Sequence, residues 1–174
     1  MNAPSSGLVL SCRNFTPQLH KSCWLAPNAT VIGQVTMAEG SSCWFNAGVR
    51  GDVSAISIGK RVNIQDGAVI HGTLDKSETV IEDDASIGHN AIVHGAHIQS
   101  HALIGMGAIV MDGAVVGAGA VVAAGAVVLE NTHIPKGTLW AGVPARERGK
   151  VSDSLKQSLA DTSNRYVTYS QWFK

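Results

Sequence analysis

Aliphatic residues recur at every sixth position along most of this chain. The most regular stretch runs through Ile98, Ile104, Val110, Val116, Val122 and Val128 without a slip. An alanine lies four residues after each of the first five of these positions, and glycines fall between them, where tight turns need small residues. The same spacing occurs earlier in two runs, Ile58, Ile64 and Ile70 and then Ile81, Ile87 and Val93, and in a less regular section from Ala26 to Trp44.

A period of six fits neither an α-helix, which repeats every 3.6 residues, nor a meander of long strands. It is typical of very short strands joined by tight turns, with three strands in each coil of about 18 residues. The pattern therefore predicts an all-β fold, a parallel β-helix. A β-sandwich or a flexible Gly/Ala-rich segment would leave the phase of the Ile and Val positions unexplained.

The repeat divides the chain into a β-helix domain and a C-terminal tail. Residues 1–150 are expected to form the domain, with an irregular segment at 1–24 and the coils at 25–144. A loop at 72–79 interrupts the repeat. Residues 151–174 are expected to be a helical tail that packs on the coils, although it could equally serve a subunit contact.

The tail shows helical spacing in its first part. Val151, Leu155 and Leu159 recur at that spacing, and Ser152 or Asp153 is a candidate N-cap. The polar run from Asp161 to Asn164 is expected to break this helix. An aromatic and aliphatic cluster follows the expected break, formed by Tyr166, Val167, Tyr169 and Trp172.

Composition indicates one soluble domain. The chain has 174 residues, 45% of them hydrophobic, and a formal net charge of +0, which argues against nucleic acid or an anionic membrane as a partner. No apolar run is long enough to span a membrane, and no basic region precedes Leu8, so neither membrane insertion nor a signal peptide is expected. Three cysteines without metal-type spacing, Cys12, Cys23 and Cys43, predict free thiols in a reducing, cytoplasmic compartment.

Three histidines occupy defined positions of the repeat. His71 follows the inward Ile70 and His94 follows the inward Val93, so both point outward from the same repeat position. If the loop after His71 replaces part of one strand, the two imidazoles stack one coil apart, at about 4.8 Å, and can converge on one metal ion. His89 lies on the preceding side of the prism, so only a three-fold assembly would bring it to a neighbouring subunit's pair.

Any one of these histidines alone would be an ordinary surface residue. The shared phase of two of them, with a third one strand away, favours a common metal site instead. The remaining histidines differ in phase and are expected to be solvated: His20, His97, His101 and His133.

Several motifs resemble those of the γ-class carbonic anhydrase family, in particular its compact bacterial members. They are Arg50-Gly51-Asp52, Asn63-Ile64-Gln65-Asp66-Gly67, His71, Ile87-Gly88-His89, Val93-His94-Gly95, Gly105-Met106-Gly107 and the run from Leu139 to Ala145. The similarity covers about residues 26–147. It implies a left-handed β-helix and a homotrimer, with a metal site at each subunit interface. It also implies that His71 and His94 of one chain share the metal with His89 of the next.

The resemblance implies the reversible hydration of CO2 to bicarbonate. Three neutral imidazoles leave Zn²⁺ an open position for water, whose pKa falls to about 7, and the resulting hydroxide attacks CO2. Fe²⁺ or Co²⁺ would suit the same ligands.

Five polar residues are implied to assist this reaction. Gln65 would hydrogen-bond the hydroxide or orient CO2, and Arg50 would pair with Asp52 across the interface and help to hold bicarbonate. Asp66 occupies the same repeat position as His89 one coil away, so a role in supporting a metal ligand or in the interface is expected, and Asn63 would orient its neighbours. A purely structural interpretation remains open, because Asn63 and Asp66 also suit a turn and the Arg50–Asp52 pair could serve assembly alone.

The sequence departs from the archaeal form of the family at the positions assigned to proton transfer. Val53 stands where that form has a glutamate, and the loop after His71 is short, with Thr73 and Leu74 in place of an acidic segment. Export of the proton would then depend on buffer, on Glu78 or on another histidine.

Two other functions stay open. Hexapeptide-repeat proteins also include CoA-dependent acyltransferases, in which His89 or His94 would be a general base without a metal. The chain could also be a metal-binding protein that has kept the site and lost hydratase activity.

Overall fold

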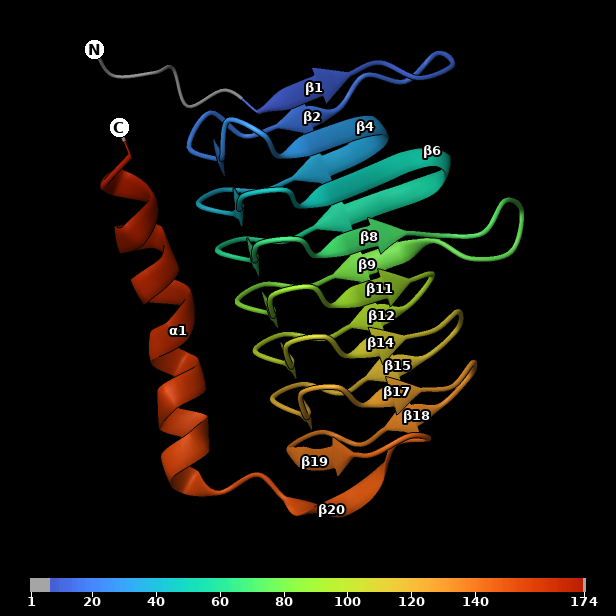
Figure 1. Ribbon diagram of the computed structural model, residues 1–174, viewed down its shortest axis with the longest axis vertical. Helices are drawn as coiled ribbons and strands as arrows, with labels where there is room; N and C mark the ends of the chain where they lie inside the picture. The colour runs from blue at the N-terminus through green and yellow to red at the C-terminus, as the bar shows by residue number, and fades with distance from the viewer. Residues whose placement is uncertain (1–6, 174) are drawn as a thin grey trace.

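The computed structural model describes residues 7–173, which form a left-handed parallel β-helix flanked by one C-terminal helix (Figure 1). Short strands stack coil upon coil and pair in parallel along the sides of a three-sided prism. The fold predicted from the six-residue period is confirmed. Within the described range, no helix has the length and apolar character needed to cross a membrane.

Two sides of the prism form one continuous sheet, because two long strands bend from one side to the other: β4 (Thr30–Met37) and β6 (Gly48–Ile58). We call these sides the first and second faces. The first face also contains β1 (Leu8–Leu10), β8 (Val69–His71), β11 (Ile92–His94), β14 (Ile109–Val110) and β17 (Val127–Val128). The second face also contains β2 (Gln18–Leu19), β9 (Thr79–Ile81), β12 (His97–Ile98), β15 (Val115–Val116) and β18 (His133–Ile134).

The third face is a separate sheet. Its strands are β3 (Trp24–Leu25), β5 (Ser42–Cys43), β7 (Asn63–Ile64), β10 (Ser86–Ile87), β13 (Leu103–Ile104), β16 (Val121–Val122) and β19 (Thr138–Ala141). The antiparallel strand β20 (Arg146–Lys150) pairs with β19 and ends the coils.

The six-residue pattern is the core of this prism. The aliphatic positions from Ile58 to Val128 are at most 3% exposed, and the alanines that follow them by four residues are equally buried. A larger residue at the alanine positions would overpack the narrow interior. The three cysteines are free thiols, as expected, with Cys43 fully buried.

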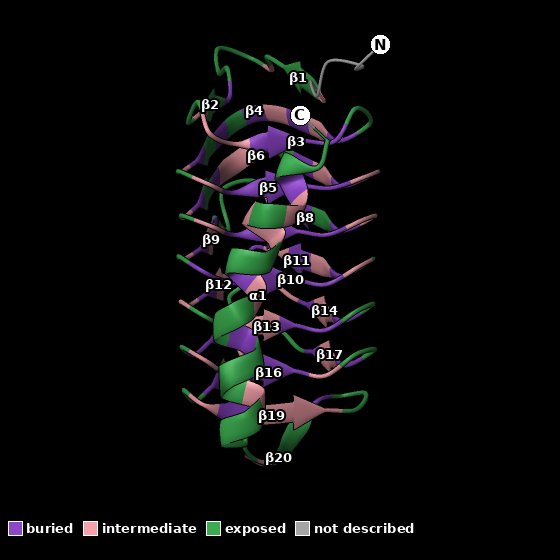
Figure 2. Ribbon diagram, turned by 90° about the vertical axis from the view of Figure 1, so that its left-hand side faces the viewer, coloured by how far each residue is buried: buried purple, intermediate pink, exposed green. Residues whose placement is uncertain are grey.

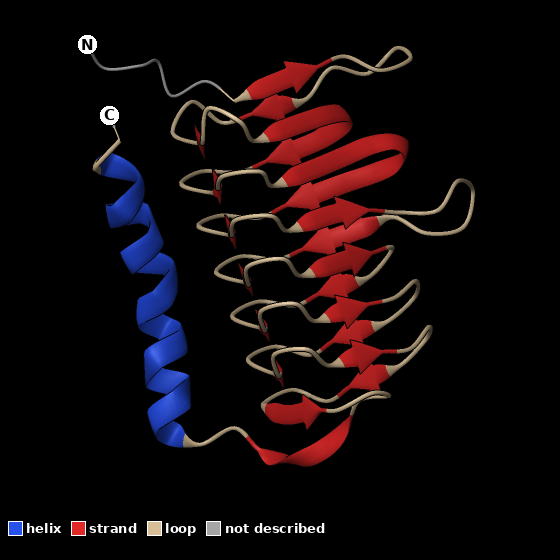
Figure 3. Ribbon diagram, viewed as in Figure 1, coloured by secondary structure: helices blue, strands red, loops and turns tan. Residues whose placement is uncertain are grey.

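The register predicted for the histidine strands is also confirmed. Val93 pairs with Ile70, and His94 therefore pairs with His71 on the adjacent strand. Between β8 and β9, residues 72–78 leave the prism as a projecting loop (Figure 3), and the following strand resumes the repeat in phase.

The segment expected to be irregular contains two strands in its described part. The strands β1 and β2 both pair with β4, so the first coil begins before residue 25. The aliphatic residues of β1 are exposed, which explains why the inward pattern is absent there.

The helix α1 (Asp153–Gln171) lies along the third face (Figure 2). Ser152 is its N-cap and accepts a hydrogen bond from the Leu155 backbone amide. Leu155 and Leu159 pack against outward side chains of the third face, such as Val121.

The break predicted at residues 161–164 was wrong, because α1 continues through them. Ser163 is only 2% exposed and donates a hydrogen bond to the Asp84 carboxylate on the coils. Thr162 hydrogen-bonds the Ser158 carbonyl one turn earlier. These contacts outweigh the weak helix propensity of the polar run.

Candidate metal centre

Two histidines face one another at the end of the first face. His71 ends β8 and His94 ends β11, one coil further along. Their ring nitrogens, Nδ1 of His71 and Nε2 of His94, are 3.1 Å apart. Their side chains are 15% and 33% exposed, so the pair is accessible from outside the prism.

Each of these rings also contacts a carboxylate. Nε2 of His71 lies 3.0 Å from Oδ1 of Asp52, and Nδ1 of His94 lies 2.9 Å from Oδ2 of Asp112. A carboxylate can only accept, so these ring nitrogens carry the hydrogen in the neutral histidines. The opposite nitrogens, which face each other, then both present lone pairs, and that arrangement is favourable only with a proton or a metal cation bound to them.

The separation of these two nitrogens fits a shared metal ion. Two imidazole nitrogens bound at about 2.0–2.1 Å in a tetrahedral site lie roughly 3.3 Å apart. The observed 3.1 Å is close to this edge length, so little movement would be needed for both to bind one ion. The donor set, two neutral imidazoles held by carboxylates, also suits Zn²⁺.

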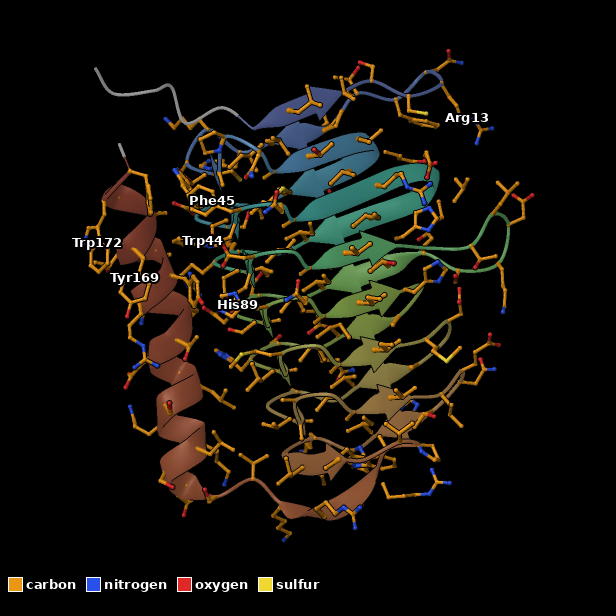
Figure 4. All side chains as sticks on the ribbon, viewed as in Figure 1. Arg13, Trp44, Phe45, His89, Tyr169 and Trp172 are labelled. Carbon is orange, nitrogen blue, oxygen red and sulfur yellow. The ribbon has the colours of Figure 1, made fainter. Side chains whose placement is uncertain are left out.

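His89 lies at another corner, in the turn between β10 and β11, where the third face meets the first. Its Nδ1 lies 2.8 Å from Oδ2 of Asp66, and its side chain is 40% exposed. Figure 4 shows it on the side of the coils that carries α1. Among residues 7–173 of one chain, no three His, Cys, Asp or Glu side chains are grouped to hold a metal.

Asn63 and Gln65 form a hydrogen-bonded row beside the same corner. Gln65 Nε2 donates to Asn63 Oδ1 at 2.9 Å, and Asn63 Nδ2 donates to Ser86 Oγ at 2.8 Å. Asn63 is fully buried and Gln65 is 7% exposed. The row fixes the orientation of the Gln65 amide and leaves its carbonyl oxygen as an acceptor for water.

Arg50 and Asp52 pair within the same chain. Arg50 Nη1 donates to Oδ2 of Asp52, whose other oxygen contacts His71. Burial alone would raise the pKa of Asp52, but the hydrogen bonds from Arg50 and His71 outweigh it and lower that pKa. Asp52 therefore stays ionised at neutral pH, and the half-exposed Arg50 remains available to an anion.

Asp112 is the contact that the sequence alone did not reveal. Asp112-Gly113 has the composition of an ordinary turn, and nothing in the six-residue pattern distinguishes it. The strand register could have indicated this contact, since Val110 pairs with Val93 and this pairing brings the turn at Asp112 beside His94. The six-residue repeat does not predict where the loop at residues 72–78, which contacts Asp112, lies in the structure.

Comparisons with known proteins identify the relatives of this chain. The family model described as bacterial transferase hexapeptide (six repeats) matches residues 95–130. A carbonic anhydrase of Geobacillus kaustophilus is 38% identical, over 96% of this chain and 91% of its own. A probable carbonic anhydrase of Methanocaldococcus jannaschii is 44% identical, over 88% of this chain and 96% of its own.

Longer relatives and solved structures extend the comparison. Gamma carbonic anhydrase 2 of Arabidopsis thaliana mitochondria is 38% identical over 90% of this chain, which spans only 58% of that relative's length. The crystal structure of a putative acetyltransferase from Bacillus cereus has a TM-score of 0.93 and 36% identity, with 96% of both chains covered. On the identity and coverage of these relatives, the chain belongs to the γ-class carbonic anhydrase family of hexapeptide-repeat proteins.

Proposed function

We propose that this protein catalyses the reversible hydration of CO2 to bicarbonate at metal centres shared between the subunits of a homotrimer. The observation that carries the proposal is the facing pair of His71 and His94, whose lone pairs converge while carboxylates hold their outer nitrogens. The carbonic anhydrase names of its relatives support the same reaction.

The ligands would be His71 and His94 of one subunit and His89 of the next. His89 matches the other two in chemistry, since Asp66 contacts its Nδ1 and leaves Nε2 as the donor. When bound, Zn²⁺ supplies a water of lowered pKa as the nucleophile, and Fe²⁺ or Co²⁺ could do the same.

The first face supports the trimer. Four outward apolar side chains on paired strands of this face form a column: Val69, Ile92, Ile109 and Val127. The first two lie two residues before His71 and His94. Val69 is 42% exposed, and the others are partly exposed. An apolar column between two corners that carry ligands favours burial against a copy of the same chain.

Other residues would handle the substrate and the proton. Gln65 accepts a hydrogen bond from the attacking water through its carbonyl oxygen, and Arg50 attracts bicarbonate. Val53 cannot transfer a proton, and Glu78 is an exposed residue that lines an open cleft of about 340 Å³ beside the loop. Proton export therefore depends on groups in contact with solvent.

Metal analysis of the purified protein tests the centre. About one Zn, Fe or Co ion per chain is expected, because a trimer with a site at each interface has as many sites as chains. A content far below that value would refute the metal-dependent hydratase.

A CO2-hydration assay, with and without added imidazole, tests the reaction. Activity that rises with imidazole is expected, because the buffer would replace the missing glutamates as proton acceptor. A metal-loaded protein with no hydration at any imidazole concentration would instead identify a binding protein without hydratase activity.

A CoA-dependent acyltransferase is the second candidate, favoured by the description of the Bacillus cereus structure. In that case His89 or His94 would act as a general base without a metal. Acyl-CoA turnover that persists after complete metal removal would support this alternative.

A further inference from the structure

Asp112 is a buried carboxylate that the reaction described above does not use. It lies in the turn after β14 and is 8% exposed. One oxygen accepts from Nδ1 of His94 at 2.9 Å, and the other accepts from the Ser77 hydroxyl.

The residues that hold Asp112 come from the projecting loop. The Thr73 amide donates to Ser77 Oγ at 3.2 Å, and Ser77 in turn reaches Asp112 on a coil further along the prism. Gly95 passes directly beneath this contact with φ +55°, and a Cβ there would collide with both Ser77 and Asp112. The loop and the turn are thus packed tightly around one carboxylate.

The same loop is attached to the other histidine of the pair. Thr79 follows its last residue and donates from Oγ1 to the His71 carbonyl oxygen at 2.5 Å. Thr79 Oγ1 also accepts from the Gly95 amide at 3.1 Å. Two short hydrogen-bond chains therefore connect the ends of the loop to both stacked histidines.

Asp112 completes a pattern that Asp52 and Asp66 begin, in which each of the three histidines has its own aspartate. Such a carboxylate fixes the ring tautomer and orientation and makes the opposite nitrogen a better donor. The Asp112 side chain is 10% exposed, against 37% for Glu82, which contacts His97 on the second face. Solvent therefore competes less for Asp112.

We propose that Asp112 is the positioning residue for His94, and that Ser77 and Thr73 of the loop hold Asp112 in place. The inference rests on the proposed metal centre. In this arrangement the short loop, although it lacks the acidic segment of the archaeal form, sets the geometry of a metal ligand.

The test measures Zn²⁺ affinity by competition with a chelator, on the assembled full-length protein. Asp112→Ala should weaken binding about 10- to 100-fold, the cost of losing such a carboxylate. Asp112→Asn keeps an acceptor for His94 without the charge, so it should bind with intermediate affinity. Ser77→Ala keeps the Asp112 carboxylate but removes a hydrogen bond that holds it. This variant should lose less Zn²⁺ affinity than Asp112→Ala.

Glu82→Ala is the matched control, because it breaks a carboxylate–histidine contact of the same kind away from the site. It should leave Zn²⁺ affinity unchanged. Nitrogen NMR of the metal-free protein gives a second readout: His94 should be Nδ1-protonated in the unsubstituted chain and a mixture of tautomers in Asp112→Ala.

The two proposals fail in different ways. If the unsubstituted protein binds no Zn²⁺, the metal centre itself is refuted. If it binds Zn²⁺ and Asp112→Ala, folded by circular dichroism, binds equally well with an unchanged His94 tautomer, the role of Asp112 is overturned and the metal centre stands. Should Asp112→Ala fail to fold, the same comparison with Asp112→Asn and Ser77→Ala decides the question.

Discussion

At the scale of single residues, the histidines show how far position in a repeat determines chemistry. The phase of His71 and His94 followed from the Ile and Val pattern, and so did the shared phase of His89 and Asp66, whose side chains the structure brings into contact. The contact of Asp112 with His94 was not predicted, because the two residues lie on different coils and Asp112-Gly113 has the composition of an ordinary turn. Which side chains share one metal ion stays a prediction.

His89→Ala should abolish metal binding and leave the fold intact. The side chain is 40% exposed and its charged contact is with the partly exposed Asp66, so the free energy of unfolding of the metal-free chain should change by less than about 0.5 kcal/mol. Elemental analysis and thermal melts measure the two effects. His97→Ala is the control, since His97 is 39% exposed and also contacts a carboxylate. Stoichiometric metal in His89→Ala would show that the ligand set is wrong.

Asp84 gives a prediction for the dependence of stability on pH. Burial alone would raise its pKa, but hydrogen bonds from Arg61 and Ser163 outweigh it and lower the pKa below the ordinary value. The Asp84 carboxylate is therefore harder to protonate in the folded chain than in the unfolded chain. Its contribution to the free energy of unfolding is complete above about pH 4 and is lost as the pH falls through the lowered pKa.

Asp84→Asn should therefore reduce the free energy of unfolding by about 2 kcal/mol at pH 7. The difference from the unsubstituted chain should shrink as the pH falls below about 4. Urea denaturation at a series of pH values measures it, with Asp75→Asn in the exposed loop as control. A difference that stays constant down to pH 3 would contradict this account of Asp84.

At the scale of secondary structure elements, the coils were predictable and the ends of the chain were not. Every inward position of the coils repeats one local environment, so a single period specified the strands from residue 58 to residue 128. The helix α1 depends instead on contacts with the third face, such as that of Ser163 with Asp84, which the local sequence does not contain. The break expected at Asp161–Asn164 failed for this reason.

Ala108→Leu tests the packing of the coils. Ala108 is fully buried, and three added carbons cannot fit the narrow prism without moving strands, so a loss of about 1–3 kcal/mol is expected. Denaturant titration measures the loss. Ala118→Leu, at an exposed position of the same repeat, should change stability by less than about 0.5 kcal/mol. Equal effects of the two substitutions would argue against a closely packed interior.

At the scale of the whole molecule, the proposed site and the proposed assembly are one hypothesis. The first face has His71 and His94 at one edge and His89 beyond the other, with an apolar column between them. A single chain cannot be expected to complete the centre, and only a closed ring of copies gives every centre the same three ligands.

Ile109→Asp tests the column on the first face without touching a ligand. A charge buried at the interface should dissociate the trimer into monomers and remove the metal in parallel. Light scattering after size-exclusion chromatography, with metal analysis of each peak, follows both. Val115→Asp is the control, because Val115 is a partly exposed outward residue on the second face. Monomers that retain metal would show that metal binding does not require the trimer.

The central claim is most directly tested by mixing two variants that are each unable to bind metal. His89→Ala lacks the single ligand, and His71→Ala combined with His94→Ala lacks the pair. After unfolding and refolding together in equal amounts, the mixture should bind about one quarter of a metal ion per chain, because about a quarter of directed subunit contacts then join an intact pair to an intact His89. Each variant refolded alone should bind none. A mixture that forms trimers yet binds no metal would contradict a centre shared between subunits.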